Sequence, residues 1–378
     1  MNRDLVDAVR VRLARTGAEP TAGEIATALR AEQAVLGDAE ILTVTRALRA
    51  DLAGVGPLEA LLADPSVTDV LVNGPGEVWV DDGAGLRRTD VRFRDESAVR
   101  RLAQRLAASA GRRLDDACPY VDARLAGGVR LHAVIPPITP EGTCVSLRLP
   151  PRRTFTLEDL AVPPVGARML RAMLHGRLAF LVTGGTGTGK TTLLSSLLSL
   201  VSPAERLVLV EDSAELRPDH PHVVRLGSRP PNVEGAGGIG LRELVRQALR
   251  MRPDRLVVGE VRGEEVVVLL SAMNTGHEGG CGTLHANAAS DVPARLEALG
   301  CAAGLTREAL HSQLAAALDV VIHLVRAPGG GARRLSEISL LVRGSDGLVA
   351  VAPALTFHPD GRIDRGAGFD RLQARVGG

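Results

Sequence analysis

Lysine is almost absent from this chain, because only one of its 45 basic residues is a lysine and the others are arginines. Aromatic residues make up 2% of the 378 residues, which argues against a surface that stacks nucleic-acid bases. The formal net charge of +1 provides no overall field that would attract a polyanion. We therefore expect no direct nucleic-acid partner.

Cysteine is scarce as well, and the four cysteines are far apart with no C-x-x-C spacing. This pattern predicts buried free thiols in a reducing compartment, without a disulfide or a metal cluster. The chain begins with no apolar signal core, and no apolar run approaches the ~18 residues that cross a bilayer. We expect a cytoplasmic chain, peripheral to the inner face of a membrane.

The single lysine, Lys190, lies in a segment that fits the Walker A pattern G-x-x-x-x-G-K-[ST]. The glycines of this pattern let backbone amides face the phosphates of a nucleotide, and the helix that follows adds the positive end of its dipole. A compact ammonium suits such a loop better than a planar guanidinium. The segment consists of Gly184, Gly185, Thr186, Gly187, Thr188, Gly189, Lys190 and Thr191.

The surroundings of this segment also fit the pattern. An apolar strand is expected before it, at 178–182, and a leucine-striped helix after it. We therefore predict a phosphate-binding loop in which the Thr191 hydroxyl is a ligand of Mg²⁺. The alternative is a glycine-rich turn without a ligand.

The chain divides into four predicted regions. Residues 1–52 form a polar-faced helical segment, either an adaptor or padding, and 53–150 form a small α+β domain. Residues 151–164 are rich in proline and form a linker, and 165–378 form the domain that contains the phosphate-binding loop. In the first two regions we expect helices at 21–32, 41–52 and 97–109 and strands at 69–72, 77–80, 129–135 and 144–149.

Strands and helices alternate in the last region, which predicts an α/β fold with a mainly parallel sheet covered by helices on both faces. An antiparallel meander is expected to end the chain. The predicted strands are 206–210 and 255–258, the helices 241–250 and 264–273, and the meander strands 320–325, 335–342 and 348–357.

Carboxylates stand at the ends of two of these apolar strands. Glu211 and Asp212 end the first strand, with Glu215 just beyond, and Glu260 ends the second. Because the carboxyl ends of parallel strands meet at the ligand crevice, these acids are candidates to hold Mg²⁺ through water or to orient the attacking water. Helix capping is the alternative. Gly259 stands where many such strands carry a metal-binding aspartate, which argues against direct ligation by that strand.

One arginine and two histidines complete the candidates in this region. Arg262 either steadies the phosphates or pairs with Glu264 or Glu265. His277 and His285 are poorly spaced for zinc with the single thiol between them. A neutral imidazole that senses the γ-phosphate is the functional hypothesis for each, and a structural histidine is the alternative.

The preceding domain contributes a group of basic residues on predicted strands. Alternate residues of a strand share one face, so Arg130 and His132 point together. With Arg124 and Arg148 they form a cationic group that either faces a nucleotide or belongs to solvated strand faces.

Together, these residues resemble the secretion and pilus-assembly traffic ATPases of the type II/IV secretion ATPase superfamily, specifically the tight-adherence (Flp) pilus branch near the conjugal-transfer ATPases. The resemblance spans residues 53–345. The chain lacks the tetracysteine zinc module of the type II branch. Its most specific stretches are 69–74, 111–115, 184–192, 211–212, 229–235, 251–263 and 283–287.

The resemblance implies a RecA-like P-loop motor domain behind the small α+β domain, assembled as a homohexamer with ATP between the domains. It also implies a motor that hydrolyses ATP with Mg²⁺ to power pilus assembly or secretion through an inner-membrane platform protein. A RecA-like DNA-remodelling ATPase and a nucleotide-gated scaffold without useful turnover are the alternatives.

The resemblance assigns roles to individual residues. Lys190, Thr191 and Thr192 hold phosphates and Mg²⁺, and Glu260 is the catalytic glutamate. The aspartate-box acids are Glu211, Asp212 and Glu215, and the histidine-box pair is His277 and His285. The arginines that reach the nucleotide are Arg124, Arg130 and Arg148.

Overall fold

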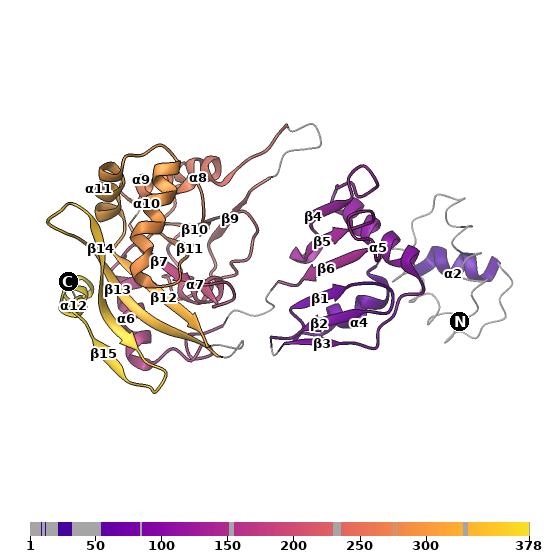
Figure 1. Cartoon of the computed structure of the whole chain (residues 1–378), viewed down its shortest axis with the longest axis horizontal. Coiled ribbons are helices and arrows are strands. Elements are labelled where there is room, and N and C mark those ends of the chain that lie inside the picture. The colour runs from indigo at the N-terminus through magenta and orange to yellow at the C-terminus, as the bar shows by residue number, and fades with distance from the viewer. Residues whose placement is uncertain are drawn as a thin grey trace. The chain divides into compact units, whose positions relative to one another are not determined.

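The computed structural model describes residues 9, 12, 22–31, 54–83, 85–150, 155–229, 236–274, 276, 278–327 and 332–377. The chain divides into two compact units, Met1–Arg152 and Arg153–Gly378 (Figure 1). Of the two predicted N-terminal helices, the one at 21–32 is present as α2 (Ala22–Ala31), and the one at 41–52 lies outside the described residues. None of the described helices combines the length and hydropathy needed to cross a bilayer.

The first unit is built on a six-stranded antiparallel sheet in the order β3-β2-β1-β6-β5-β4. Its four predicted strands are present, while β3 and β4 had no predicted counterpart. The strands are β1 (Asp69–Val72), β2 (Val78–Asp81), β3 (Leu86–Arg88), β4 (Tyr120–Arg124), β5 (Arg130–Val134) and β6 (Cys144–Arg148). The short helices η1 (Gly56–Leu58), α4 (Glu59–Ala63) and η2 (Ala126–Gly128) complete it.

Helix α5 (Glu96–Ser109) provides the core of this unit, as its apolar spacing predicts. Val99, Leu102 and Leu106 recur on one face and are buried against the sheet. Asp95 caps the helix, because its carboxylate accepts a hydrogen bond from the amide of Ala98 at 2.8 Å.

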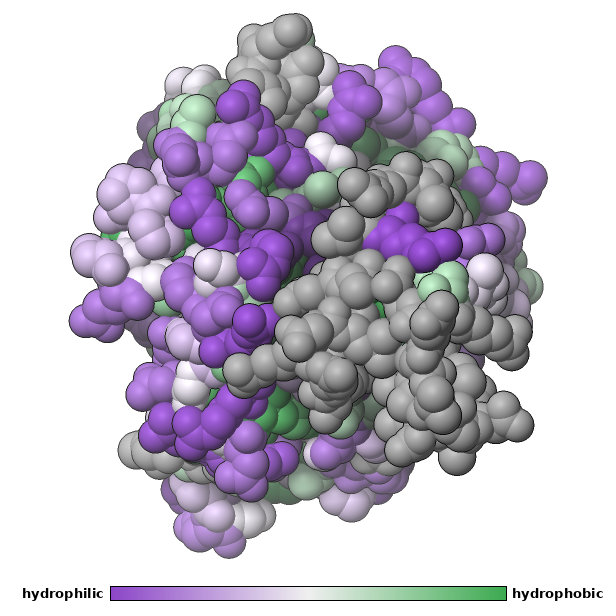
Figure 2. Space-filling view, turned by 90° about the vertical axis from the view of Figure 1, so that its right-hand side faces the viewer, coloured by the Kyte–Doolittle hydropathy of each residue, from purple (hydrophilic) through white to green (hydrophobic). Residues whose placement is uncertain are grey.

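On the face shown in Figure 2 the described residues are mostly hydrophilic, and hydrophobic ones show only in small patches.

The second unit is built on one nine-stranded sheet in the order β15-β14-β13-β12-β7-β11-β10-β8-β9. The phosphate-loop strand β7 is central, with parallel neighbours on both sides. The predicted C-terminal meander is present and extends this same sheet. The strands are β7 (Phe180–Gly184), β8 (Leu207–Glu211), β9 (Val223–Gly227), β10 (Arg255–Val261), β11 (Cys281–His285), β12 (Val320–Arg326), β13 (Arg333–Arg343), β14 (Val349–Phe357) and β15 (Ile363–Arg365).

Helices cover both faces of this sheet, because alternate residues of its central strands face opposite sides. Phe180 and Val182 pack in the core with α6, α7 and α12, whereas Leu181 packs in the core with α8 to α11. The helices are α6 (Pro164–His175), α7 (Lys190–Leu198), α8 (Leu241–Leu249), α9 (Glu265–Met273), η3 (Ala289–Asp291), α10 (Val292–Ala302), α11 (Arg307–Ala317) and α12 (Phe369–Val376).

Part of the range predicted as a linker belongs to the core of the second unit. Leu157 is 2% exposed and Val162 is 9% exposed, and both pack with α6 and β7. An apolar side chain in a tether would stay in water, so these residues are better placed in the unit that they stabilise.

The cysteines are free, but their burial differs from the prediction. Cys281 on β11 is fully buried, and burial raises the pKa of its thiol to about 12. Cys118 and Cys144 are partly buried, and Cys301 on α10 is exposed. The reason is that Cys301 lies on the outer face of a covering helix, which the spacing of the cysteines does not reveal.

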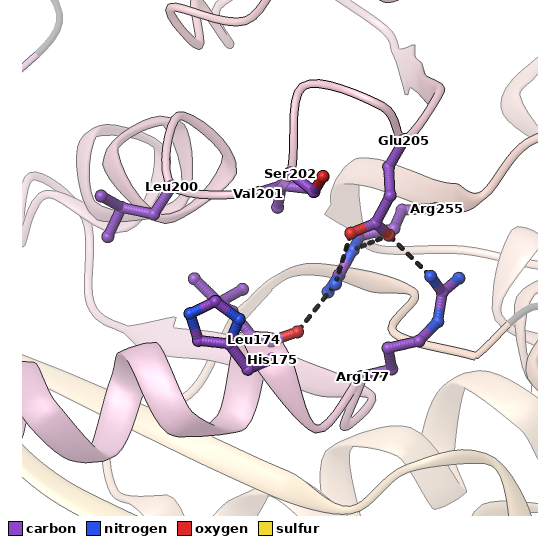
Figure 3. A pocket seen from close by; sticks show the side chains of 8 residues that line it. All are labelled: Leu174, His175, Arg177, Leu200, Val201, Ser202, Glu205 and Arg255. Carbon is purple, nitrogen blue, oxygen red and sulfur yellow. Dashed lines mark hydrogen bonds and ion pairs between the residues drawn. The ribbon is translucent and has the colours of Figure 1, made fainter.

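A buried ion-pair cluster lies at the amino ends of the parallel strands, whereas the phosphate-binding loop follows the carboxyl end of β7. Arg255, 2% exposed, begins β10 and donates to Glu205 at 2.9 Å and to the carbonyl of Leu174 in the last turn of α6 at 2.7 Å. Arg177 contacts the same Glu205 carboxylate at 2.8 Å (Figure 3). The Arg255 guanidinium thus satisfies a carbonyl at the C-terminus of α6, and these residues line a cavity of about 200 Å³.

Candidate active site

The predicted phosphate-binding loop connects the end of β7 to the start of α7. Gly184, Gly187 and Gly189 have φ values of +149°, +72° and +93°, which L side chains rarely adopt. A Cβ at Gly184 would also lie 2.5 Å from the carbonyl oxygen of Leu324 on β12. The glycines are therefore required by backbone shape and by the close approach of the neighbouring strand.

Lys190 begins α7 and is 8% exposed. Its Nζ donates to the carbonyl oxygens of Gly184 at 3.1 Å and Gly185 at 2.9 Å, and lies 3.3 Å from Nε2 of His285. Burial lowers the pKa of the Lys190 ammonium, and the charges of Glu260 and Glu215 act in the opposite direction. The ammonium is thus held at the mouth of the loop, with carboxylates nearby.

His285 ends β11, where the register places it beside Gly184. Its Nε2 lies 3.1 Å from Oε1 of Glu260 on β10. Burial, followed by the charge of Lys190, lowers the pKa of His285, while Glu260 acts to raise it. A neutral imidazole therefore stands between the ammonium and the carboxylate, and the structure brings three predicted site residues into contact.

Glu211 lies at the end of β8 and is 3% exposed. Its Oε1 accepts hydrogen bonds from the amides of Glu215 at 2.8 Å and Leu216 at 2.9 Å, so it shapes the loop after the strand. A Cβ at Gly259 would lie 2.7 Å from Cγ of Glu211. The space in which an aspartate at 259 would project is therefore filled by Glu211 from the neighbouring strand.

Arg262 does not pair with the side chains of Glu264 or Glu265, contrary to that alternative. Its guanidinium pairs with the Asp212 carboxylate instead. Glu264 pairs with Arg242 at 2.8 Å. Glu265 is buried and accepts from the backbone amide of Arg262 at 2.6 Å, because it lies at the start of α9.

The three arginines of the first unit form a row across neighbouring strands. The register pairs Arg124 with Arg130, and Arg130 with Arg148. A tight turn joins β4 to β5, with Gly127 and Gly128 at φ values of +76° and +85°. All three arginines are exposed.

Arg130 and Arg148 have acidic partners within their own unit. Arg130 contacts Asp122 at 2.7 Å, and Arg148 contacts Asp69 at 2.9 Å. Their roles at a nucleotide stay predictions. His277, the other predicted histidine, lies outside the described residues.

His323 on β12 is a site neighbour that sequence reasoning missed. It is 4% exposed, and its Nδ1 lies 2.9 Å from the hydroxyl of Thr183, the residue before the loop. Burial lowers the pKa of His323, so the ring is neutral and fixes the end of β7. The sequence signal that could have identified His323 is its position as a polar residue within an otherwise apolar strand.

Comparison with known proteins identifies the family of this chain. The sequence matches the family model described as type II/IV secretion system protein over residues 51–342. A Mycobacterium tuberculosis protein named for conjugal transfer is 56% identical over 354 residues, which cover 90% of this chain and 99% of that protein. PtlH, a type IV secretion system protein of Bordetella pertussis, is 32% identical, with coverage of 73% of this chain and 91% of PtlH.

Solved structures show the fold. The pilus retraction motor PilT with bound ADP has a TM-score of 0.56 at 24% identity, covering 76% of this chain and 82% of that one. The ATPase DotB of Legionella pneumophila has a TM-score of 0.52 at 19% identity, covering 76% and 80%. The second unit has the RecA-like P-loop fold and is preceded by a smaller domain, which confirms the predicted fold class.

Proposed function

The chain belongs to the type II/IV secretion system protein family, and we propose that it is an ATP-hydrolysing motor that powers secretion or pilus assembly. The observation that carries this proposal is the contact series from Lys190 at the phosphate-binding loop through His285 to Glu260. A cation for phosphates and a carboxylate for water thus meet at one point, as hydrolysis of a nucleotide requires.

Each residue has a part in this reaction. The amides from Gly184 to Gly189 and the ammonium of Lys190 hold the phosphates, and Thr192 adds its hydroxyl or amide at the start of α7. Glu260 orients the attacking water and takes up its proton. His285 positions the Glu260 carboxylate and separates it from Lys190.

Mg²⁺ prefers oxygen ligands, and the chain offers a hydroxyl at the start of α7 and a carboxylate after β8. The Thr191 hydroxyl and the Asp212 carboxylate are the candidate ligands, and the cation would neutralise charge that develops on the phosphates. Asp212 is paired with Arg262, so ligation requires exchange of that partner. Glu211 shapes the loop that carries Glu215, and Glu215 contributes negative charge near Lys190.

We further propose the finer assignments. The chain would act as a homohexamer at the cytoplasmic side of the inner membrane, with a membrane platform protein as its partner. The row of Arg124, Arg130 and Arg148 would contribute cations to the nucleotide, and His277 would complete the histidine pair. The specific stretches of the sequence, including 69–74 and 251–263, support the tight-adherence branch.

The test compares phosphate release by the wild type with release by Glu260→Gln and Glu264→Gln. Glu264 is a matched control because it is an exposed carboxylate four residues along the chain that pairs with Arg242. We expect Glu260→Gln to bind ATP and release phosphate at least about a hundredfold more slowly, while Glu264→Gln stays near the wild-type rate. Normal turnover by Glu260→Gln would contradict the proposal, as would a rate that depends on added DNA.

A further inference from the structure

Two arginines outside the predicted site flank the phosphate-binding loop. Strand β12 runs parallel to β7 with Leu324 beside Gly184, so its last residue, Arg326, continues alongside the loop. Strand β13 begins with Arg333, which lies directly opposite Arg326 in the antiparallel register.

Both side chains reach the loop itself. A Cβ at Gly187 would lie 3.5 Å from Nη1 of Arg326, and a Cβ at Gly189 would lie 3.5 Å from Cδ of Arg333. Directly opposed residues of an antiparallel pair project from the same face of the sheet. The two arginines therefore approach the loop from one side, and both are exposed.

The charges of this pair indicate an anionic ligand. Arg326 and Arg333 place two positive charges directly opposite each other on neighbouring strands, beside the phosphate-binding loop. The connecting residues 327–332 contain no acid. Guanidinium groups bind phosphate oxygens well, and the adjacent loop is built to hold phosphates.

The sheet order identifies which end of the nucleotide they face. Lys190, His285 and Glu260 meet on the side of β7 where β11 and β10 lie. The bond to the γ-phosphate would be cleaved on that side, next to Glu260. Arg326 and Arg333 lie on the opposite side of β7, with β12 and β13. That side would face the phosphates that remain after hydrolysis.

We propose that Arg326 and Arg333 bind the α- and β-phosphate end of the nucleotide. This inference rests on the proposed function, because it uses the same loop and the same nucleotide. The two arginines contribute to the binding of ADP and ATP alike and leave the cleavage step to Glu260.

The experiment measures the Kd of ADP and of ATP, with Mg²⁺, for the wild type, Arg326→Gln, Arg333→Gln and the control Arg343→Gln. Arg343 lies at the other end of β13, where it donates to the carbonyl of Gly347 at 3.2 Å. We expect each of the first two substitutions to weaken both nucleotides equally, by about tenfold, as loss of one charge-assisted contact predicts. The kcat at saturating ATP should stay within about twofold.

Two results would overturn the inference. One is unchanged ADP affinity in both variants while their thermal midpoints match the wild type. The other is a lowered kcat with unchanged ADP affinity, because it would place the arginines at the γ-phosphate or at the nucleotide of a neighbouring subunit. A wild-type protein that binds neither nucleotide contradicts the proposed function, whereas a binding wild type with unaffected variants contradicts only the arginine assignment.

Discussion

Nε2 of His285 lies 3.1 Å from Oε1 of Glu260, and this contact gives a pH dependence. The pKa of His285 is lowered, so the imidazole is neutral at pH 7 and becomes charged only below its ordinary range near 6.5. A charged ring would tie up Glu260 and repel Lys190. We therefore expect the hydrolysis rate to fall as the pH drops below the ordinary range of a histidine.

The variant His285→Gln tests this contact, because glutamine keeps a hydrogen bond to Glu260 but does not titrate in this range. We expect its acid limb to move toward lower pH, while ATP affinity at pH 7.5 changes by less than about threefold. A pH–rate profile between pH 5 and 8 provides the measurement. An acid limb identical to that of the wild type would show that another group titrates there.

Gly259 and Glu211 give a second prediction, for stability. A methyl group at Gly259 would lie 2.7 Å from Cγ of Glu211, so Gly259→Ala displaces a buried carboxylate that holds two backbone amides. We expect a loss of about 2 kcal/mol in the free energy of unfolding. Gly227→Ala is the matched control, since nothing lies within 4 Å of a Cβ on that β9 glycine. Equal urea midpoints for the two variants would contradict the prediction.

The buried cluster of Arg255, Arg177 and Glu205 gives a third prediction. Arg255→Met removes one of the two cations from Glu205 and the donor from the carbonyl of Leu174. Breaking a buried pair in this way costs about 3 kcal/mol of stability. The exposed pair of Arg171 and Glu158 is the control, because solvent screens it and Arg171→Met should leave the urea midpoint close to that of the wild type. A loss below 1 kcal/mol for Arg255→Met in urea unfolding would refute the prediction.

The sequence predicted the elements that have strong periodicity. The phosphate loop, its strand and its helix have fixed spacing, and α5 has an unbroken apolar face. Strand β9 was missed because it lies at the edge of the sheet, where its residues are only partly buried and show no apolar run. Strand β3 is three exposed residues long, which is too short for a pattern.

Contacts between distant residues were harder to predict than elements. A pair with a glutamate two or three residues away was one of the two alternatives for Arg262, but its partner is Asp212, on the loop after a neighbouring strand. The row from Arg124 through Arg130 to Arg148 likewise depends on strand register. Sequence spacing places a residue at the end of a strand, but which ends meet is decided by the order of strands in the sheet.

The rarity of lysine in this chain leads to the final prediction. Lys190 is buried, and its Nζ contacts two loop carbonyls and His285 within 3.3 Å. A guanidinium is planar and wider than an ammonium, and it cannot direct its donors at three points around one small volume. We therefore expect Lys190→Arg to lose ATP binding almost as completely as Lys190→Ala, by more than about a hundredfold.

A fluorescent-nucleotide titration measures this loss, and thermal unfolding shows that each variant is folded. Lys190→Arg keeps the charge, so its comparison with Lys190→Ala separates the effect of charge from that of shape. If shape decides, both variants fail and the exception among 45 basic residues is explained by the geometry of one loop. Wild-type affinity in Lys190→Arg would instead show that charge alone suffices and that the single lysine has no steric cause.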